Sequence, residues 1–203
     1  MRFTTSWDDG YALDLRIADL LEAHGCAGTF YVCPVTQHRR AMLKEADLRT
    51  LDRRGFEIGA HTLTHPKLTR CDDATAREEI AGSKARLEEI LAKPCAMFCY
   101  PKGDEDRRIR NLVKEAGYRG ARTVEDLRMD AGVDPFSIPT TLQVAPFPWR
   151  KSKATWWHHL DPLGPARARY GRLRAIGGPH AAMRSWTALA GHLVVRALRE
   201  GGT

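Results

Sequence analysis

The chain has 203 residues, of which 43% are hydrophobic and 28% are charged, and its formal net charge is +7. This length is enough to bury one core, and the composition is that of an ordinary soluble protein. No run of eighteen apolar residues occurs, so we expect no membrane-spanning helix.

Short strand-like segments alternate with segments of helical period along the first two-thirds of the chain. The predicted strands cover residues 2–7, 29–33, 57–60, 96–100 and 119–123. The predicted helices cover residues 12–23, 45–54, 72–91 and 105–116. This alternation predicts an α/β fold with a parallel sheet and right-handed crossovers. The pattern alone does not separate an open sheet from a barrel.

Carboxylates and imidazoles follow two of these strands. Asp8 and Asp9 come after the first strand, and His61 and His65 come after the third. The ends of strands are where α/β folds place their chemistry, and a helical turn would bring both histidine rings to one face. The set predicts a divalent-metal site with one carboxylate left over as a general base. Thr62 stands where metalloproteases carry their glutamate base, so Asp8 is the candidate.

Each motif also has an ordinary explanation. An Asp-Asp-Gly sequence after a strand is a common turn, and Gly10 completes such a turn here. Pairs of histidines four residues apart also occur by chance. The catalytic interpretation therefore depends on several motifs occurring together.

Four segments of this chain occur in the order and spacing of the polysaccharide deacetylases. The segments are Ser6-Trp7-Asp8-Asp9-Gly10, Gly28-Thr29-Phe30-Tyr31-Val32, Glu57-Ile58-Gly59-Ala60-His61-Thr62-Leu63-Thr64-His65 and Phe98-Cys99-Tyr100-Pro101-Lys102-Gly103. From residue 2 to about residue 141 the chain resembles this family, carbohydrate esterase family 4. The resemblance implies a distorted (β/α) barrel and hydrolysis of N-acetyl or O-acetyl groups on a carbohydrate.

The resemblance also implies roles for individual residues. Asp9, His61 and His65 would hold the metal, usually Zn2+, and Asp8 would be the general base. The loop that contains Tyr100, Pro101 and Gly103 would line the sugar site. A backbone N–H of that loop would help to hold the oxyanion.

The third motif of the family usually reads Arg-x-Pro-Tyr, and this chain has Cys99 and Lys102 at the two outer positions. A backbone N–H survives such a substitution, so Lys102 can still serve the oxyanion. Cys99 cannot replace a guanidinium that orients Asp8, so another cation is needed. Arg122, at the end of a later predicted strand, is the candidate, and a solvated surface arginine is the alternative interpretation.

Family members close with a strand that carries a histidine, which acts as general acid. Here a helix-like stretch at residues 181–199 runs into Gly201 and Gly202, and we expect the barrel to be incomplete at its C-terminus. The chain is then either truncated or a degenerate relative. None of the other histidines matches the motif, so none is assigned the acid role: His24, His38, His158, His159, His180 and His192.

Two parts of one domain are expected: a catalytic part at residues 1–145 and a basic, tryptophan-rich extension at residues 146–203. Residues 150–203 contain ten Lys or Arg and two acids, and Trp149, Trp156, Trp157 and Trp186 lie in or beside this stretch. Arginine with tryptophan suits an anionic membrane surface, a lipid-diphosphate glycan or, as the least favoured partner, nucleic acid. A solvated extension without a partner is the alternative.

Five cysteines without metal-type spacing are most simply explained as reduced thiols. The chain also enters its first strand without room for a signal peptide, which favours a cytoplasmic location. An intracellular acetylated carbohydrate, lipid-linked or nucleotide-linked, would then be the substrate. Two functions stay open: a metal-dependent carbohydrate N-deacetylase, and a catalytically impaired relative that binds a glycan or a partner.

Overall fold

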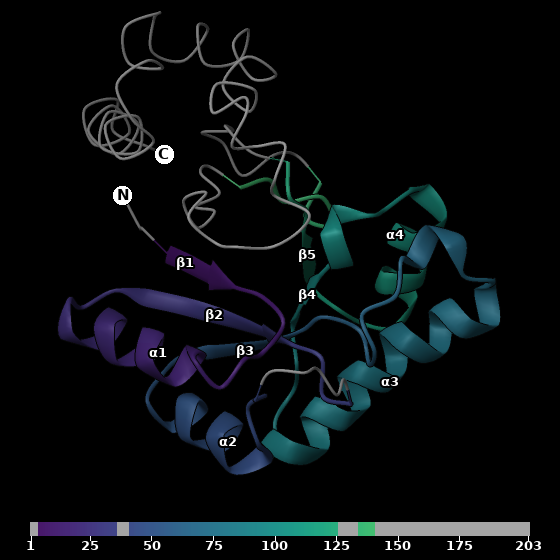
Figure 1. The fold of residues 1–203 in the computed structure, drawn as a ribbon. Helices are drawn as coiled ribbons and strands as arrows, with labels where there is room; N and C mark the ends of the chain where they lie inside the picture. Colours follow the sequence, from purple (N-terminus) through teal and green to yellow (C-terminus); the bar gives the residue numbers. More distant parts are fainter. Residues whose placement is uncertain (1–3, 36–40, 126–133, 141–203) are drawn as a thin grey trace, which may run out of the picture. The chain divides into compact units, whose positions relative to one another are not determined.

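The computed structural model describes residues 4–35, 41–125 and 134–140. Five parallel strands form one sheet in the order β1-β2-β3-β4-β5 (Figure 1). The strands are β1 (Thr4–Trp7), β2 (Ala27–Val32), β3 (Glu57–Ala60), β4 (Met97–Cys99) and β5 (Gly120–Arg122). The helices are α1 (Asp14–Ala23), α2 (Glu45–Arg53), α3 (Asp73–Leu91) and α4 (Arg107–Glu115), with the short 3-10 helices η1 (Leu68–Arg70) and η2 (Pro101–Gly103).

The order of the strands decides between the two architectures that the sequence left open. Each strand pairs with the next one along the chain, and all four pairings between these strands are parallel. Right-handed crossovers between successive neighbours place all connecting helices on the same side, as in a barrel, rather than on both sides. Figure 1 shows α1 to α4 following one another along one side of the sheet. The expected α/β fold with a curved, incomplete barrel is confirmed for the described residues.

A further segment continues the sheet beyond β5. Ile138 forms a parallel bridge with Arg122, and the N–H of Thr123 donates to the carbonyl oxygen of Ile138 at 2.9 Å. The N–H of Ala121 donates to the carbonyl oxygen of Pro135 at 2.8 Å. Because these bonds are made along the outer edge of β5, that edge is covered rather than left open.

The core lies between the sheet and the inner faces of the helices. Its largest fully buried apolar side chains include Phe30, Leu51, Leu68, Leu87 and Phe98. Burying a side chain of this size contributes about 1.5–3 kcal/mol. This packing holds the five strands in register, so that their carboxyl ends come to the same edge of the sheet.

The five strands and four helices predicted between residues 2 and 123 were all found, and most of their ends moved by one to a few residues. Asp72, expected as the first residue of a helix, is the N-cap of α3 and accepts from the Thr75 N–H at 2.7 Å. The strand predicted at residues 96–100 is shorter, since β4 pairs only over Met97–Cys99. Local sequence gives the type of element, but the neighbouring strand decides where pairing ends.

None of the helices that the structure describes is long and apolar enough to cross a bilayer. The basic extension at residues 146–203, with the helix-like stretch at 181–199, lies outside the described residues. The predicted boundary between residues 145 and 146 therefore stays a prediction.

Candidate functional site

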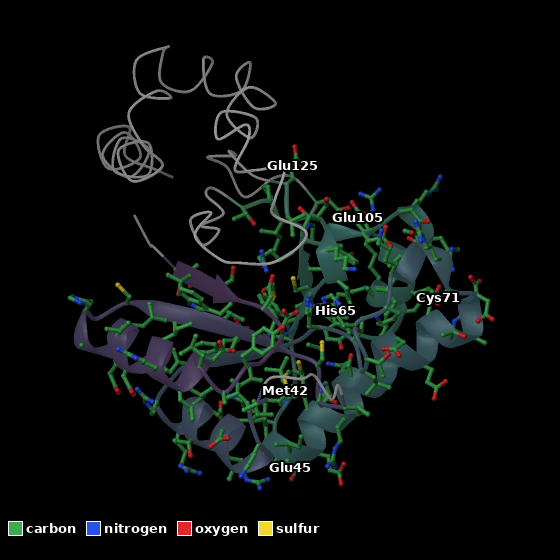
Figure 2. All side chains as sticks on the ribbon, viewed as in Figure 1. Met42, Glu45, His65, Cys71, Glu105 and Glu125 are labelled. Atoms are coloured by element: carbon green, nitrogen blue, oxygen red, sulfur yellow. The ribbon has the colours of Figure 1, made fainter. Side chains whose placement is uncertain are left out.

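The candidate site lies at the carboxyl edge of the sheet, where β1, β3, β4 and β5 end. Asp8 and Asp9 follow β1, His61 follows β3, and Arg122 is the last residue of β5. Gly10 makes the turn after β1 possible, because it has a φ of +77° and a Cβ there would lie 2.8 Å from Cγ1 of Val32. His65, labelled in Figure 2, lies near the centre of that view, beside the ends of the strands.

The three predicted metal ligands converge. Asp9 Oδ1 lies 3.4 Å from His65 Nε2 and 3.7 Å from His61 Nε2, and the three ligand atoms lie within 4.8 Å of one another. Tetrahedral zinc with bonds of about 2.0–2.2 Å requires separations of about 3.3–3.6 Å between ligand atoms. An Asp-His-His set at these distances fits a divalent cation after a small contraction.

His61 is held in the tautomer that a metal ligand needs. Its ring is 2% exposed, and its Nδ1 lies 2.7 Å from the carbonyl oxygen of Cys99. A carbonyl oxygen only accepts, so Nδ1 carries the proton and Nε2 keeps a lone pair toward Asp9. Burial lowers the pKa of His61, which also favours the neutral ring.

The loop that carries both histidines is not helical, which corrects the expected reason for their convergence. Thr62 and His65 both have a φ of 66°, in the left-handed region. Thr62 Oγ1 accepts from the His65 N–H at 3.0 Å and so closes the loop. Left-handed backbone at a residue other than glycine costs on the order of 1–3 kcal/mol and tends to occur at functional sites. The rings meet because of this backbone, and their centroids lie 4.8 Å apart.

The same backbone feature marks the whole site. Five described residues other than glycine have positive φ, and four of them lie at the carboxyl edge: Asp9, Thr62, His65 and Lys102. The fifth, Ala92, is the C-cap of α3, where such a conformation is usual. The strain is therefore concentrated at the candidate site.

Arg122 contacts Asp8, as expected for the cation that replaces the family's arginine. Arg122 Nη2 donates to Asp8 Oδ1 and lies 3.1 Å from Cys99 Sγ. Its guanidinium also lies over the Tyr31 ring, with Cζ 5.3 Å from the centroid, and its side chain is 12% exposed. The alternative of a solvated surface arginine is therefore wrong.

Cys99 occupies the place beside Asp8 without offering a charge to it. The side chain is fully buried, and burial raises the pKa of its thiol well above the ordinary value, with Asp8 adding to the rise. Asp8, His61 and Cys99 also lie close enough to share an ion. This second set fits a cation poorly, because the positively charged Arg122 is already paired with Asp8 and its Nη2 lies 3.1 Å from Cys99 Sγ.

The loop after β4 corrects part of the expected sugar site. Tyr100 is 0% exposed and its hydroxyl donates to the carbonyl oxygen of Phe136 at 2.9 Å, so its side chain lies in the core. Pro101 is also buried. Neither side chain lines the site as expected. Lys102, with a φ of 60°, is exposed, and Gly103 packs so closely on Val124 that a Cβ there would clash.

Two buried carboxylates near the site were missed by sequence reasoning. Asp14, in the first turn of α1, is 4% exposed, and its Oδ2 has no hydrogen-bond partner among the described residues. Burial raises its pKa to about 7, and the charges of Asp9 and Asp8 add to this. Glu79 on α3 is 8% exposed and bonds the histidine loop. Both resembled ordinary helix-surface acids in the sequence.

The general acid is not found among the described residues. His24, the one described histidine besides His61 and His65, is exposed at the C-cap of α1, which leads to the opposite end of the sheet. His38, His158, His159, His180 and His192 lie outside the described residues.

Several solved structures with a similar fold are deacetylases or relatives of deacetylases. The described fold is similar to a Streptococcus pyogenes deacetylase, PplD, in complex with acetate, with a TM-score of 0.63 and 18% identity over 66% of this chain and 61% of that one. It is similar to a polysaccharide deacetylase from Bacillus cereus, with a TM-score of 0.59 and 22% identity over 68% of this chain and 45% of that one. A pseudoenzyme of carbohydrate esterase family 4 from Bacillus anthracis gives a TM-score of 0.53 and 15% identity over 62% of this chain and 44% of that one.

The chain thus spans between about two-fifths and three-fifths of the length of these relatives. No curated protein sequence matches the chain. The family model for polysaccharide deacetylases matches residues 3–121, which is more than half of the chain. With the strand order and the Asp-His-His cluster described above, this match shows that the chain belongs to the polysaccharide deacetylases of carbohydrate esterase family 4.

Proposed function

We propose that this chain is a metal-dependent hydrolase that removes N-acetyl or O-acetyl groups from a carbohydrate. Its family is that of the polysaccharide deacetylases, whose enzymes act on acetylated carbohydrates and generally depend on a metal. The observation that carries the proposal is the convergence of Asp9, His61 and His65 beside an Asp8 carboxylate that is paired with Arg122. Such hydrolysis needs a set of side chains that bind the metal and one further carboxylate that acts as the general base.

Asp9, His61 and His65 would hold the cation, and zinc suits a set of two imidazoles and one carboxylate. When bound, the cation would polarise the acetyl carbonyl and acidify a water molecule. Asp8 would accept the proton of that water, since it follows the β1 strand beside Asp9. Arg122 would keep the Asp8 carboxylate aimed at the site. The Lys102 backbone N–H would donate to the oxyanion of the tetrahedral intermediate.

A cytoplasmic location and a lipid-linked or nucleotide-linked sugar complete the proposal. All five cysteines are free thiols in the structure, which supports a reducing compartment. A precursor sugar would carry phosphate groups. The basic excess of residues 150–203 is compatible with such a substrate.

The experiment that tests the proposal separates the base from the ligands. Asp8→Asn should lower the rate of release of acetate from an acetylated chitooligosaccharide by about 100-fold or more, because general-base catalysis is worth about that much. Its metal content should stay near that of the wild type, because Asp8 is not a ligand. His61→Ala should lose the metal together with activity. Metal content is measured by elemental analysis and activity by acetate release.

Glu78→Gln is the matched control, because Glu78 is exposed on α3 and outside the site. It should retain both the metal and the rate. Equal metal loss in Asp8→Asn and His61→Ala would show that the roles of the two aspartates are misassigned. A wild-type chain that binds no divalent metal would refute the proposed function.

A second function, a catalytically impaired protein that binds a glycan, is favoured by Cys99. The residue stands where the family has an arginine, and no general-acid histidine is found among the described residues. One structural relative is itself a pseudoenzyme. Binding of an acetylated oligosaccharide by a zinc-loaded wild type that releases no acetate would support this function.

A further inference from the structure

Glu79 bonds the loop that carries both histidine ligands. Its Oε2 accepts from the N–H of Leu63 at 2.8 Å and from the N–H of Thr64 at 2.9 Å. Its Oε1 accepts from the Thr64 hydroxyl at 2.5 Å. One buried carboxylate therefore holds three donors from the two residues between Thr62 and His65.

These hydrogen bonds stabilise a backbone conformation that is unfavourable for the residues that adopt it. Thr62 is β-branched and yet has a φ of 66°, a conformation that is rare for such a residue. The two N–H groups that follow it point to the same oxygen and form a small anion-binding concavity. Because Glu79 fills this concavity, the left-handed turn is stabilised by a partner outside the loop.

The helix that carries Glu79 also packs on the loop one turn further along. A Cβ at Gly82 would lie 2.8 Å from Cδ1 of Leu63, so the Leu63 side chain occupies the space that glycine leaves. The inner face of α3 is fixed in the core through Ile80 and Leu87, both 0% exposed. The loop therefore docks on a well-anchored element.

We propose that Glu79 is a positioning residue of the metal site, which sets the distance between His61 and His65 by anchoring the loop between them to α3. This inference rests on the proposed function, since it assigns Glu79 a role toward the same Asp9-His61-His65 cluster. No hydrogen bond from Glu79 to an imidazole or to Asp9 is found in the described part of the chain, so its effect passes through the backbone.

The experiment compares three variants of the full chain. In Glu79→Ala, amide hydrogen exchange at Leu63 and Thr64 should accelerate, and zinc affinity should fall about tenfold or more, as expected when an outer support of a metal site is lost. Glu79→Gln should stay close to the wild type in both measurements. Its amide oxygen can accept both N–H groups while its NH2 donates to the Thr64 hydroxyl.

Glu88→Ala is the matched structural control. Glu88 is a carboxylate on the same helix that accepts a loop N–H, that of Cys95, at 2.9 Å, and it pairs with Lys84. Its removal should accelerate exchange at Cys95 and leave zinc affinity unchanged. Zinc affinity is measured with the metal alone, by competition against a chromophoric chelator, and thermal unfolding of the metal-free proteins is recorded alongside.

The outcomes separate this inference from the proposed function. A Glu79→Ala protein with wild-type zinc affinity, or an equal loss of affinity in Glu88→Ala, would overturn the inference while the metal site stands. If the wild type binds no zinc, the proposed function fails. Exchange at Leu63 and Thr64 would still decide whether Glu79 anchors the loop.

Discussion

The pKa of Asp14 depends on the negative charge of the candidate site. Its carboxyl group is buried near Asp8 and Asp9, and its Oδ2 has no hydrogen-bond partner among the described residues. Of these three carboxylates, Asp8 is paired with Arg122. Burial and the two neighbouring charges therefore raise the pKa of Asp14 to about 7. A cation bound at Asp9 would offset part of this repulsion.

The raised pKa predicts how stability depends on pH. In the unfolded chain Asp14 loses its proton near its ordinary pKa of 3.8, whereas the folded chain keeps the proton until about pH 7. The free energy of unfolding should therefore fall as pH rises from about 4 to about 7, with a slope of at most about 1.4 kcal/mol per pH unit. Asp14→Asn should remove this slope and be the more stable protein at pH 8 when no metal is present.

Chemical denaturation in the presence of a chelator, from pH 4 to pH 8, measures this effect. Asp19→Asn is the control on the same helix, because its carboxylate is exposed and its ion pair with Arg54 contributes little. An Asp14→Asn protein that is less stable than the wild type at pH 8 would show that the ionised carboxylate is favourable in the fold.

Among the helices, α4 begins directly after a loop of the candidate site, and its first turn is capped by a side chain. Helix α4 starts after the loop of Lys102 and Gly103, and its N-cap Asp106 accepts from the Ile109 N–H at 2.8 Å. The inner face of this helix is buried through Ile109, Leu112 and Val113. Because Asp106 accepts from the N–H of the buried Ile109, the cap fixes the end of the loop relative to the core.

Asp106→Ala should destabilise the protein by about 1 kcal/mol, since an N-cap acceptor is lost. Asp106→Asn should stay near the wild type, because its amide oxygen still accepts. Thermal and denaturant unfolding of both variants provide the measurement. Equal stability of the alanine and asparagine variants would mean that the cap contributes nothing to α4.

At the scale of the whole molecule, the charge is divided between two parts of the chain. Residues 150–203 carry ten cations and two acids, which gives +8, and the remainder is then +7 minus +8, or −1. These residues lie outside the described part, and their charge follows from the sequence. Each cation near an anionic bilayer contributes on the order of 1 kcal/mol, and the attraction is screened by salt.

We therefore expect the full chain to co-sediment with vesicles that contain anionic lipid, and to dissociate as salt rises. Replacing Arg167, Arg169, Arg172 and Arg174 by glutamine should weaken this binding. Replacing four exposed cations of the described part, Lys67, Arg70, Arg107 and Arg119, should not. Equal partitioning onto anionic and neutral vesicles would contradict a role of the extension in membrane contact. The extension would then have a structural role only, and its charge would be incidental.

Much of the fold and part of the site could be predicted from local sequence. The alternation of β-forming and helix-period segments predicts an α/β fold, and β3 was found with the predicted bounds. Polar residues directly after β1 and β3 meet because parallel strands end at one edge. Asp9, His61 and His65 could therefore be assigned to one site without a structure.

Several contacts of the candidate site could not be predicted from local periodicity, because they depend on how distant segments pack together. The direction of the Tyr100 side chain depends on the register of β4, and the contact of Arg122 with Asp8 depends on the succession of strands between β1 and β5. Convergence of the two histidine rings depends on left-handed backbone at Thr62 and His65 and on Glu79, 14 residues after His65. Which residues stand at the ends of strands could be predicted from the sequence alone, because that pattern is local. Their contacts required the fold, because they join segments far apart along the chain.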